Sequence, residues 1–264
     1  MQLDTAQIQR ALLLAAICSQ TYEQFANPDG SFVLPDSYSL YDTIEAKSLV
    51  GLWERFGFIL HSPDEIVVAF RGTSSTTNWI ADVIATQQKF KWSKEACLTH
   101  RGFTGIYASA RRQVMSALRR LPENKTLYVT GHSLGGALAT LCALDIAANT
   151  ERVPVLFTFG SPRTGDPDFA KACANHVPNS YRIANVFDVV THAPPHLFKL
   201  PNQEKTYYYS HVAMACPLDF PSMSLSSNHG IGSYFAQLGR LESDFAAQLA
   251  AHPGFCPANE GDAC

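Results

Sequence analysis

A chain of 264 residues is long enough for one large α/β domain or for two small domains. Hydrophobic residues make up 46% of the chain and charged residues 16%, which supplies a sizeable core and excludes wholesale disorder. The formal net charge of −3 lacks the basic surplus of nucleic-acid-binding proteins, so we expect no nucleic-acid partner. Glycine and proline form no linker and no internal repeat is present, so we predict a single domain over residues 1–264.

The longest apolar run is Ala11 to Cys18, which is shorter than the roughly 18 residues that a transmembrane helix needs. Asp4 and a single basic residue, Arg10, precede it, unlike the basic start of a signal peptide. Residues at helical spacing predict an N-terminal helix of the mature fold: Ile8, Leu12, Ala15, Ser19 and Tyr22. We expect no transmembrane segment and a secreted protein whose signal has been removed, with a cytoplasmic location as the alternative.

Residues 27–42 resemble a loop, after which Ser48–Leu60 and Glu65–Phe70 are predicted to pair as strands around a His-Ser-Pro-Asp turn. Farther along, short apolar segments alternate with segments of helical periodicity. The predicted strands are Leu127–Thr130, Val155–Phe159, Ser180–Val186 and Thr206–Ala213. The predicted helices are Tyr107–Arg120, Leu134–Ala148, one opened by Asp166 and Pro167, and Ile231–Leu249. This alternation predicts an α/β fold with a largely parallel sheet covered by helices on both faces.

The seven cysteines are an odd number, so in a secreted protein at least one would stay free or pair with another chain. Cys142 and Cys173 lie in apolar helical patterns and are predicted to be core thiols. Cys256 and Cys264 flank the C-terminal tail, and either could tie it down. Connectivity and redox compartment stay open at this point.

The pentapeptide Gly131-His132-Ser133-Leu134-Gly135 has the form G-x-S-x-G. A predicted strand leads directly into it and a predicted helix leaves directly after it, which is the context that a nucleophilic serine motif requires. The sharp turn would strain the serine backbone, and the helix N-terminus would place partial positive charge beside it. We predict that Ser133 is a nucleophile; the alternative is an ordinary strand-to-helix turn with a capping serine.

A serine nucleophile needs a histidine to take its proton and an acid to orient the histidine. In α/β hydrolases these follow the serine in the order acid, then histidine. His229 lies in Ser-Asn-His-Gly, a predicted loop before the last helix, and is our predicted base. His211 lies in an aromatic-rich strand pattern, where a packed or hydrogen-bonded role is expected.

The predicted acid is Asp188, because it follows the strand Ser180–Val186 at the carboxyl edge where such sheets carry their sites. Asp145 lies inside the helix that follows the serine and points the wrong way along it. Asp166 is better explained as a helix cap, and Asp168 as a first-turn charge. A solvated loop aspartate is the alternative for Asp188.

Several motifs together resemble the class 3 lipases, the family of the filamentous-fungal triacylglycerol lipases. They span about residues 45–240 in the family's order. The matching stretches are Phe70–Ser75 with Asn78 and Trp79, His100–Phe103, Thr130–Leu141, Phe159–Arg163, Tyr181–Asp188 with Pro194 and Pro195, and His229–Phe235.

The resemblance implies the α/β-hydrolase fold and a catalytic triad of Ser133, Asp188 and His229. It also implies an oxyanion hole formed by Thr73, through its backbone N–H and hydroxyl, and by the backbone N–H of Leu134. Arg71, His100 and Arg163 match family positions that look structural.

The segment from Ser74 to about Ile84 matches the position of the family's helical lid. Its apolar residues Trp79, Ile80 and Val83, together with Ile84, are expected to cover the serine in water and to contact acyl chains at a lipid surface. The alternative is that they fill the core.

The resemblance implies a carboxylic-ester hydrolase, foremost a triacylglycerol lipase, that meets its lipid or ester substrate at a transient lipid–water interface. A phospholipase A1 or a feruloyl-type esterase is the alternative, and an inactive interaction module is a third. No His, Cys or Asp spacing of ligand type is found, so we expect no metal and no cofactor.

Overall fold

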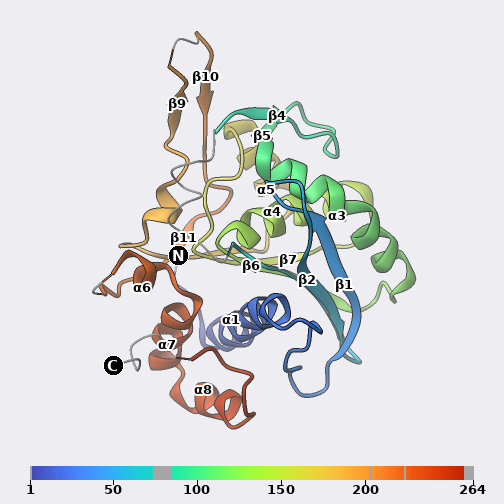
Figure 1. The fold of residues 1–264 in the computed structure, drawn as a ribbon, viewed down its shortest axis with the longest axis vertical. Helices are drawn as coiled ribbons and strands as arrows, with labels where there is room; N and C mark the ends of the chain where they lie inside the picture. The colour runs from blue at the N-terminus through green and yellow to red at the C-terminus, as the bar shows by residue number, and fades with distance from the viewer. Residues whose placement is uncertain (1, 74–84, 202–203, 223, 259–264) are drawn as a thin grey trace.

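The structure is a computed structural model that describes residues 2–73, 85–201, 204–222 and 224–258 (Figure 1). Its centre is a seven-stranded sheet in the order β1-β2-β3-β6-β7-β8-β11. The strands are β1 (Ser39–Lys47), β2 (Trp53–His61), β3 (Glu65–Phe70), β6 (Thr126–His132), β7 (Val155–Phe159), β8 (Ser180–Asn185) and β11 (Ala215–Leu218). The first two pairings are antiparallel and all pairings from β3 onward are parallel. The carboxyl ends of β3, β6, β7 and β8 therefore share one edge of the sheet.

Helices cover both faces of this sheet, as the α/β prediction required (Figure 1). One face carries α1 (Thr5–Ala26), α7 (Ile231–Leu241) and α8 (Ser243–Ala250). The other carries α3 (Arg101–Arg120), α4 (Leu134–Asn149) and α5 (Pro167–His176). Because side chains alternate along a strand, Val67 of β3 packs into the first layer and Val68 into the second. Burial on both faces explains why β3 reads as a near-continuous apolar run.

The N-terminal helix prediction is confirmed, and its apolar run lies buried against the sheet. Asp4 caps α1 by accepting from the Gln7 N–H, while the Gln7 side chain accepts from the Asp4 N–H. The residues from Leu14 to Thr21 are all buried. Among the described residues, no helix is both long enough and apolar enough to cross a membrane.

Three predicted segments differ from the structure. Part of the predicted loop 27–42 belongs to β1, an edge strand whose mixed polar pattern hides its pairing. The predicted strand Thr206–Ala213 ends early: β10 (Thr206–Tyr208) pairs with β9 (Leu197–Lys199) in a hairpin that projects from the body (Figure 1). The predicted helix Ile231–Leu249 is two helices, because the backbone leaves helical geometry at Glu242.

Sequence reasoning also missed β11, which contains Pro217 and lies at the edge of the sheet, where a proline is tolerated. The remaining elements are short: β4 (Gln87–Lys89), β5 (Leu98–His100), the 3-10 helix η1 (Val189–His192) and α6 (Leu225–His229). Cys142 and Cys173 are buried core thiols, as predicted, and the six described cysteines are all free. Cys264 lies outside the described residues.

Candidate active site

Ser133 occupies a strained turn between β6 and α4, as the pentapeptide predicted. Its backbone has φ 58° and ψ −130°, in the region that favours glycine, and its side chain is fully buried. A Cβ on Gly131 would lie 2.2 Å from the carbonyl oxygen of Gly135, and one on Gly135 would lie 2.2 Å from that of Phe70. Both glycines are therefore required for the turn to pack against β3.

Asp188 and His229 come together at the carboxyl edge of the sheet, from elements far apart in the chain. His229 Nδ1 lies 2.7 Å from Asp188 Oδ2, and both side chains are buried. The Val190 N–H donates to the other carboxylate oxygen at 2.9 Å. With a carboxylate as its acceptor, Nδ1 carries the imidazole proton, which leaves the lone pair of Nε2 available.

Gly160, at the end of β7, joins the nucleophile segment to this pair. Ser133 N–H donates to the carbonyl of Phe159 at 2.9 Å. A Cβ on the next residue, Gly160, would lie 2.8 Å from Asp188 Oδ2 and 3.0 Å from His229 Nδ1. Ser133 Oγ and His229 Nε2 are both buried, and neither has a hydrogen-bond partner within the described chain. These are the two atoms between which a proton would move in serine hydrolysis.

Sequence reasoning gave no role to Tyr234, which helps to fix the acid. Its hydroxyl donates to Asp188 Oδ2 at 2.7 Å and accepts from the Asn185 N–H at 3.0 Å. Tyr234 lies one helical turn into α7, five residues after His229. The only signal in the sequence was an aromatic residue at that spacing from a histidine.

Sequence reasoning also missed a chain of hydrogen bonds that runs through His132. The Tyr22 hydroxyl lies 2.7 Å from His132 Nδ1, and His132 Nε2 lies 2.7 Å from the backbone carbonyl of His229. Burial lowers the pKa of His132 well below its ordinary 6.5, so the ring is neutral. Its Nε2–H then donates to His229 while its Nδ1 accepts from Tyr22. Helix α1 and the strained turn thus hold the backbone that carries His229.

Thr73 and Leu134, the predicted oxyanion-hole residues, both lie beside the nucleophile segment. Thr73 Oγ1 is buried without a partner in the described chain, and Leu134 begins α4, so its N–H has no acceptor within the helix. A Cβ on Gly72 would lie 3.0 Å from Ser133 Cβ, which brings the Thr73 segment to the nucleophile. Arg71 holds this segment by donating to the Gly72 carbonyl at 2.8 Å.

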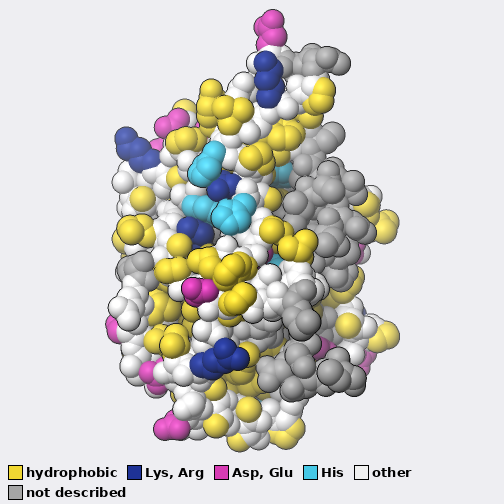
Figure 2. Space-filling view, turned by 90° about the vertical axis from the view of Figure 1, so that its left-hand side faces the viewer, with side chains coloured by type: hydrophobic (Ala, Val, Ile, Leu, Met, Phe, Trp, Pro, Cys, Tyr) yellow, Lys and Arg dark blue, Asp and Glu magenta, His cyan; other side chains and the backbone are white. Residues whose placement is uncertain are grey.

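A cavity of about 390 Å³ adjoins these residues. Its lining includes Thr73, His132 and His229, together with residues of α1 and of the start of α7. The segment around Asp188 exposes Val186, Phe187 and Val189, which are 51%, 45% and 43% accessible. Figure 2 shows one face of the molecule on which hydrophobic side chains gather beside a group of histidines.

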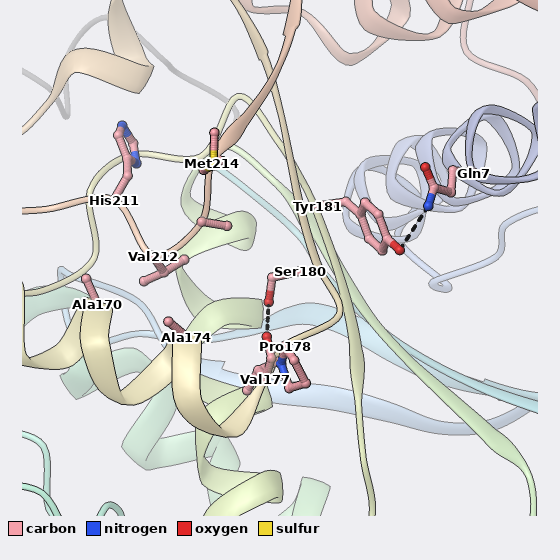
Figure 3. Close-up of a pocket in the computed structure, with 11 residues that line it drawn as sticks. Gln7, Ala170, Ala174, Val177, Pro178, Ser180, Tyr181, His211, Val212 and Met214 are labelled. Carbon is pink, nitrogen blue, oxygen red and sulfur yellow. Dashed lines mark hydrogen bonds between the residues drawn. The ribbon is translucent and has the colours of Figure 1, made fainter. Parts of the chain in front are cut away.

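A larger cavity, about 590 Å³, lies at the opposite edge of the sheet (Figure 3). It surrounds the start of β8, where Gln7 donates to the Tyr181 hydroxyl at 3.1 Å. Sites in α/β proteins form at the carboxyl ends of parallel strands, and this cavity is at the amino ends. His211, which lines it, lies 2.8 Å from the Thr191 carbonyl, and burial lowers its pKa to about 3. His211 is therefore a packed histidine, as predicted, but in a loop rather than a strand.

The other acids and cations that we set aside have structural contacts. Asp145 accepts from the Tyr107 hydroxyl and the Arg111 guanidinium, each at 2.6 Å. Asp166 caps α5 by accepting from the Phe169 N–H at 2.8 Å. Arg163 donates to the Pro194 carbonyl at 2.7 Å. The expected lid, Ser74 to Ile84 with Trp79, Ile80 and Val83, lies outside the described residues.

Comparison with known proteins gives one family match and several relatives. A family model described as lipase (class 3) matches residues 67–198, half of the 264 residues. A lipase of Rhizomucor miehei is 32% identical over 179 residues, covering 63% of this chain and 49% of that protein. Phospholipase A1-Igamma2 of Arabidopsis thaliana is 31% identical over 214 residues, covering 63% of this chain and 40% of that protein. The chain spans about half the length of the curated relatives it matches.

Solved structures give the same fold. Lipase II from Rhizopus niveus aligns with a TM-score of 0.64 at 28% identity, covering 74% of this chain and 77% of that one. A lipase from Rhizopus microsporus var. chinensis aligns with a TM-score of 0.63 at 28% identity, covering 74% of this chain and 71% of that one.

Proposed function

Since this chain belongs to the class 3 lipase family, with the α/β-hydrolase fold, we propose that it hydrolyses carboxylic esters of acylglycerols as a triacylglycerol lipase. We assign Ser133 as nucleophile, His229 as general base and Asp188 as the acid that orients it. One observation carries the assignment. Ser133 and His229 both lie against the end of β7, and His229 Nδ1 is bound to Asp188. Ser133 Oγ and His229 Nε2 are buried and have no partner in the described chain.

In the acylation step, Ser133 Oγ attacks the ester carbonyl carbon while His229 Nε2 takes the hydroxyl proton. Asp188 holds Nδ1–H and stabilises the imidazolium that forms. The carbonyl oxygen becomes an oxyanion, which accepts from Thr73 and from the Leu134 N–H. Each such donor typically contributes about 3–4 kcal/mol to transition-state stabilisation.

The tetrahedral intermediate then collapses, the carbon–oxygen bond to the alcohol breaks, and His229 Nε2 returns the proton to the leaving oxygen. In deacylation, His229 takes a proton from water as the water attacks the acyl-enzyme. The second collapse releases the fatty acid and returns the proton to Ser133 Oγ. Neither acylation nor deacylation requires a cofactor.

A phospholipase A1 is the second candidate, because several curated relatives of similar identity carry that name. Support for acylglycerols comes from the lipase relatives and from a neighbour described as a triacylglycerol lipase with a serine protease triad, at 25% identity. The exposed Val186, Phe187 and Val189 around Asp188 suit contact with an apolar substrate phase.

The test is a matched set of substrates given to one preparation: p-nitrophenyl esters of increasing chain length, emulsified triglyceride, phospholipid and a feruloyl ester. Triglyceride turnover above phospholipid turnover is the expected result. A dominant rate on phospholipid or on the feruloyl ester would reassign the substrate. Absence of turnover on all of them, in a folded protein, would replace the enzyme with an interaction module.

A further inference from the structure

The proposed function requires a place for the alcohol part of the substrate. His229 Nε2 must hand its proton to the leaving alcohol oxygen, so that oxygen lies within hydrogen-bond reach of the ring. His229 is one of the residues that line the 390 Å³ cavity. We therefore place the group attached to the leaving oxygen in this cavity, an assignment that rests on the proposed function.

Helix α1 also contributes residues to the lining of this cavity, one of them charged. Ser19, Tyr22 and Glu23 all line it, because residues three and four apart share one face of a helix. Glu23 is exposed, and its carboxylate has no ion-pair partner among the described residues. It is the one formally charged side chain in the described lining.

No cation balances Glu23 within the described lining. Arg71 precedes the lining residue Thr73 by two positions, but it is 2% exposed and paired with Glu54 at 3.0 Å. Proteins that bind a phosphate usually present arginine or lysine to it. The described lining holds neither, and the start of α7 contributes only backbone N–H groups.

We propose that Glu23 is a specificity-determining residue that selects uncharged alcohol groups and disfavours esters whose alcohol carries a phosphate. The substrate class of the site is then neutral acylglycerols, and the anionic glycerophospholipids are its poor substrates. The selection is electrostatic: a phosphate on the same glycerol as the leaving oxygen is repelled by the Glu23 carboxylate, and the described lining holds no lysine or arginine to offset the repulsion.

The experiment compares dihexanoylglycerol with dihexanoyl phosphatidylglycerol, both below the concentration at which they aggregate, so that only the head group differs. The measured quantity is the ratio of kcat/KM for the phospholipid to kcat/KM for the neutral lipid. Glu23→Gln should raise this ratio by roughly threefold and Glu23→Lys by roughly tenfold, as expected for removing and reversing one surface charge. Both substitutions suit an exposed helix position, so α1 should be retained.

Glu151→Lys is the matched control, because it makes the same change in net charge at an exposed position before β7, at the opposite edge of the sheet. It should leave the ratio unchanged. An equal rise in Glu151→Lys, no rise in Glu23→Lys, or a wild type that prefers the phospholipid would each overturn the proposal. Failure of the wild type to hydrolyse any of the esters would instead remove the proposed function, and this inference with it.

Discussion

At the scale of single residues, three buried polar atoms at the site have no partner in the described chain: Ser133 Oγ, His229 Nε2 and Thr73 Oγ1. Such atoms are costly unless a reaction uses them. Ser133→Ala removes the nucleophile and little else. We expect kcat to fall by about 10⁶, since triad members act as one unit, with the melting temperature unchanged or raised. A fluorophosphonate probe should label the wild type at Ser133 and leave the variant unlabelled. A variant that keeps a tenth of the activity would show that another residue attacks the ester.

Substitutions of Asp188, His229 and His211 distinguish the proposed acid, the proposed base and a packed histidine. Asp188→Asn should lower kcat by about 10⁴, because an amide favours the wrong tautomer of His229. His211→Ala should lower stability more than turnover, since the His211 ring is bonded to the Thr191 carbonyl and to none of the triad side chains. The measurements are kcat and thermal melting of each variant. Loss of activity in a normally melting His211→Ala protein, with activity kept in His229→Ala, would reverse the assignment.

At the scale of secondary-structure elements, the junction of β6 and α4 depends on glycines, because a side chain at Gly131 or Gly135 would collide with neighbouring backbone. Gly135→Ala would put a methyl group 2.2 Å from the Phe70 carbonyl oxygen, so β3 and α4 would have to separate. We expect a loss of about 3 kcal/mol or more in the free energy of unfolding, as in other overpacked cores. Chemical denaturation measures it.

Gly105→Ala in α3 provides the control for that substitution. A Cβ on Gly105 meets nothing within 4 Å, so the added methyl group acts only on helix propensity. The free energy of unfolding should rise by about 1 kcal/mol. Equal effects of the two glycine substitutions would mean that the close approach of β3 to α4 does not limit the fold.

The features that could not be predicted from the sequence are the edge strands and the contacts between residues far apart in the chain. β7 was predicted to its last residue, since buried parallel strands are uniformly apolar; β1 and β11 were not, since edge strands mix polar residues and proline with apolar ones. Ser133, Asp188 and His229 could be predicted because each lies beside a local motif, and the structure brings Asp188 and His229 together. Tyr22 and His132 meet across 110 residues of sequence, and no local pattern marks that contact.

At the scale of the whole molecule, buried histidines make stability depend on pH. His100 caps α3: its Nδ1 accepts from the N–H groups of Gly102 and Phe103 at 3.1 and 3.3 Å. Burial lowers its pKa from 6.5 to about 4. Between those values the unfolded chain binds a proton at His100 that the folded chain does not, so stability falls as pH drops through that window.

His100→Asn should keep the cap, because asparagine accepts at helix N-termini, and it has no titratable group. We expect the free energy of unfolding of the wild type to fall by about 3 kcal/mol more than that of the variant between neutral pH and pH ~4. Urea unfolding at a series of pH values gives both curves. Parallel curves would show that His100 is not the group that titrates.

The hydrogen bonds of His132 also determine how late in folding the site is completed. They join Tyr22 to His132 across 110 positions and His132 to His229 across 97, so both contacts close long loops. Closing such loops is slow compared with forming helices. During synthesis, α1 and the serine turn emerge long before α6, and the growing chain therefore carries an inert serine. Under the proposed assignment, hydrolytic capacity cannot appear before α6 has left the ribosome and docked, and on refolding it should recover after the helical circular dichroism signal does.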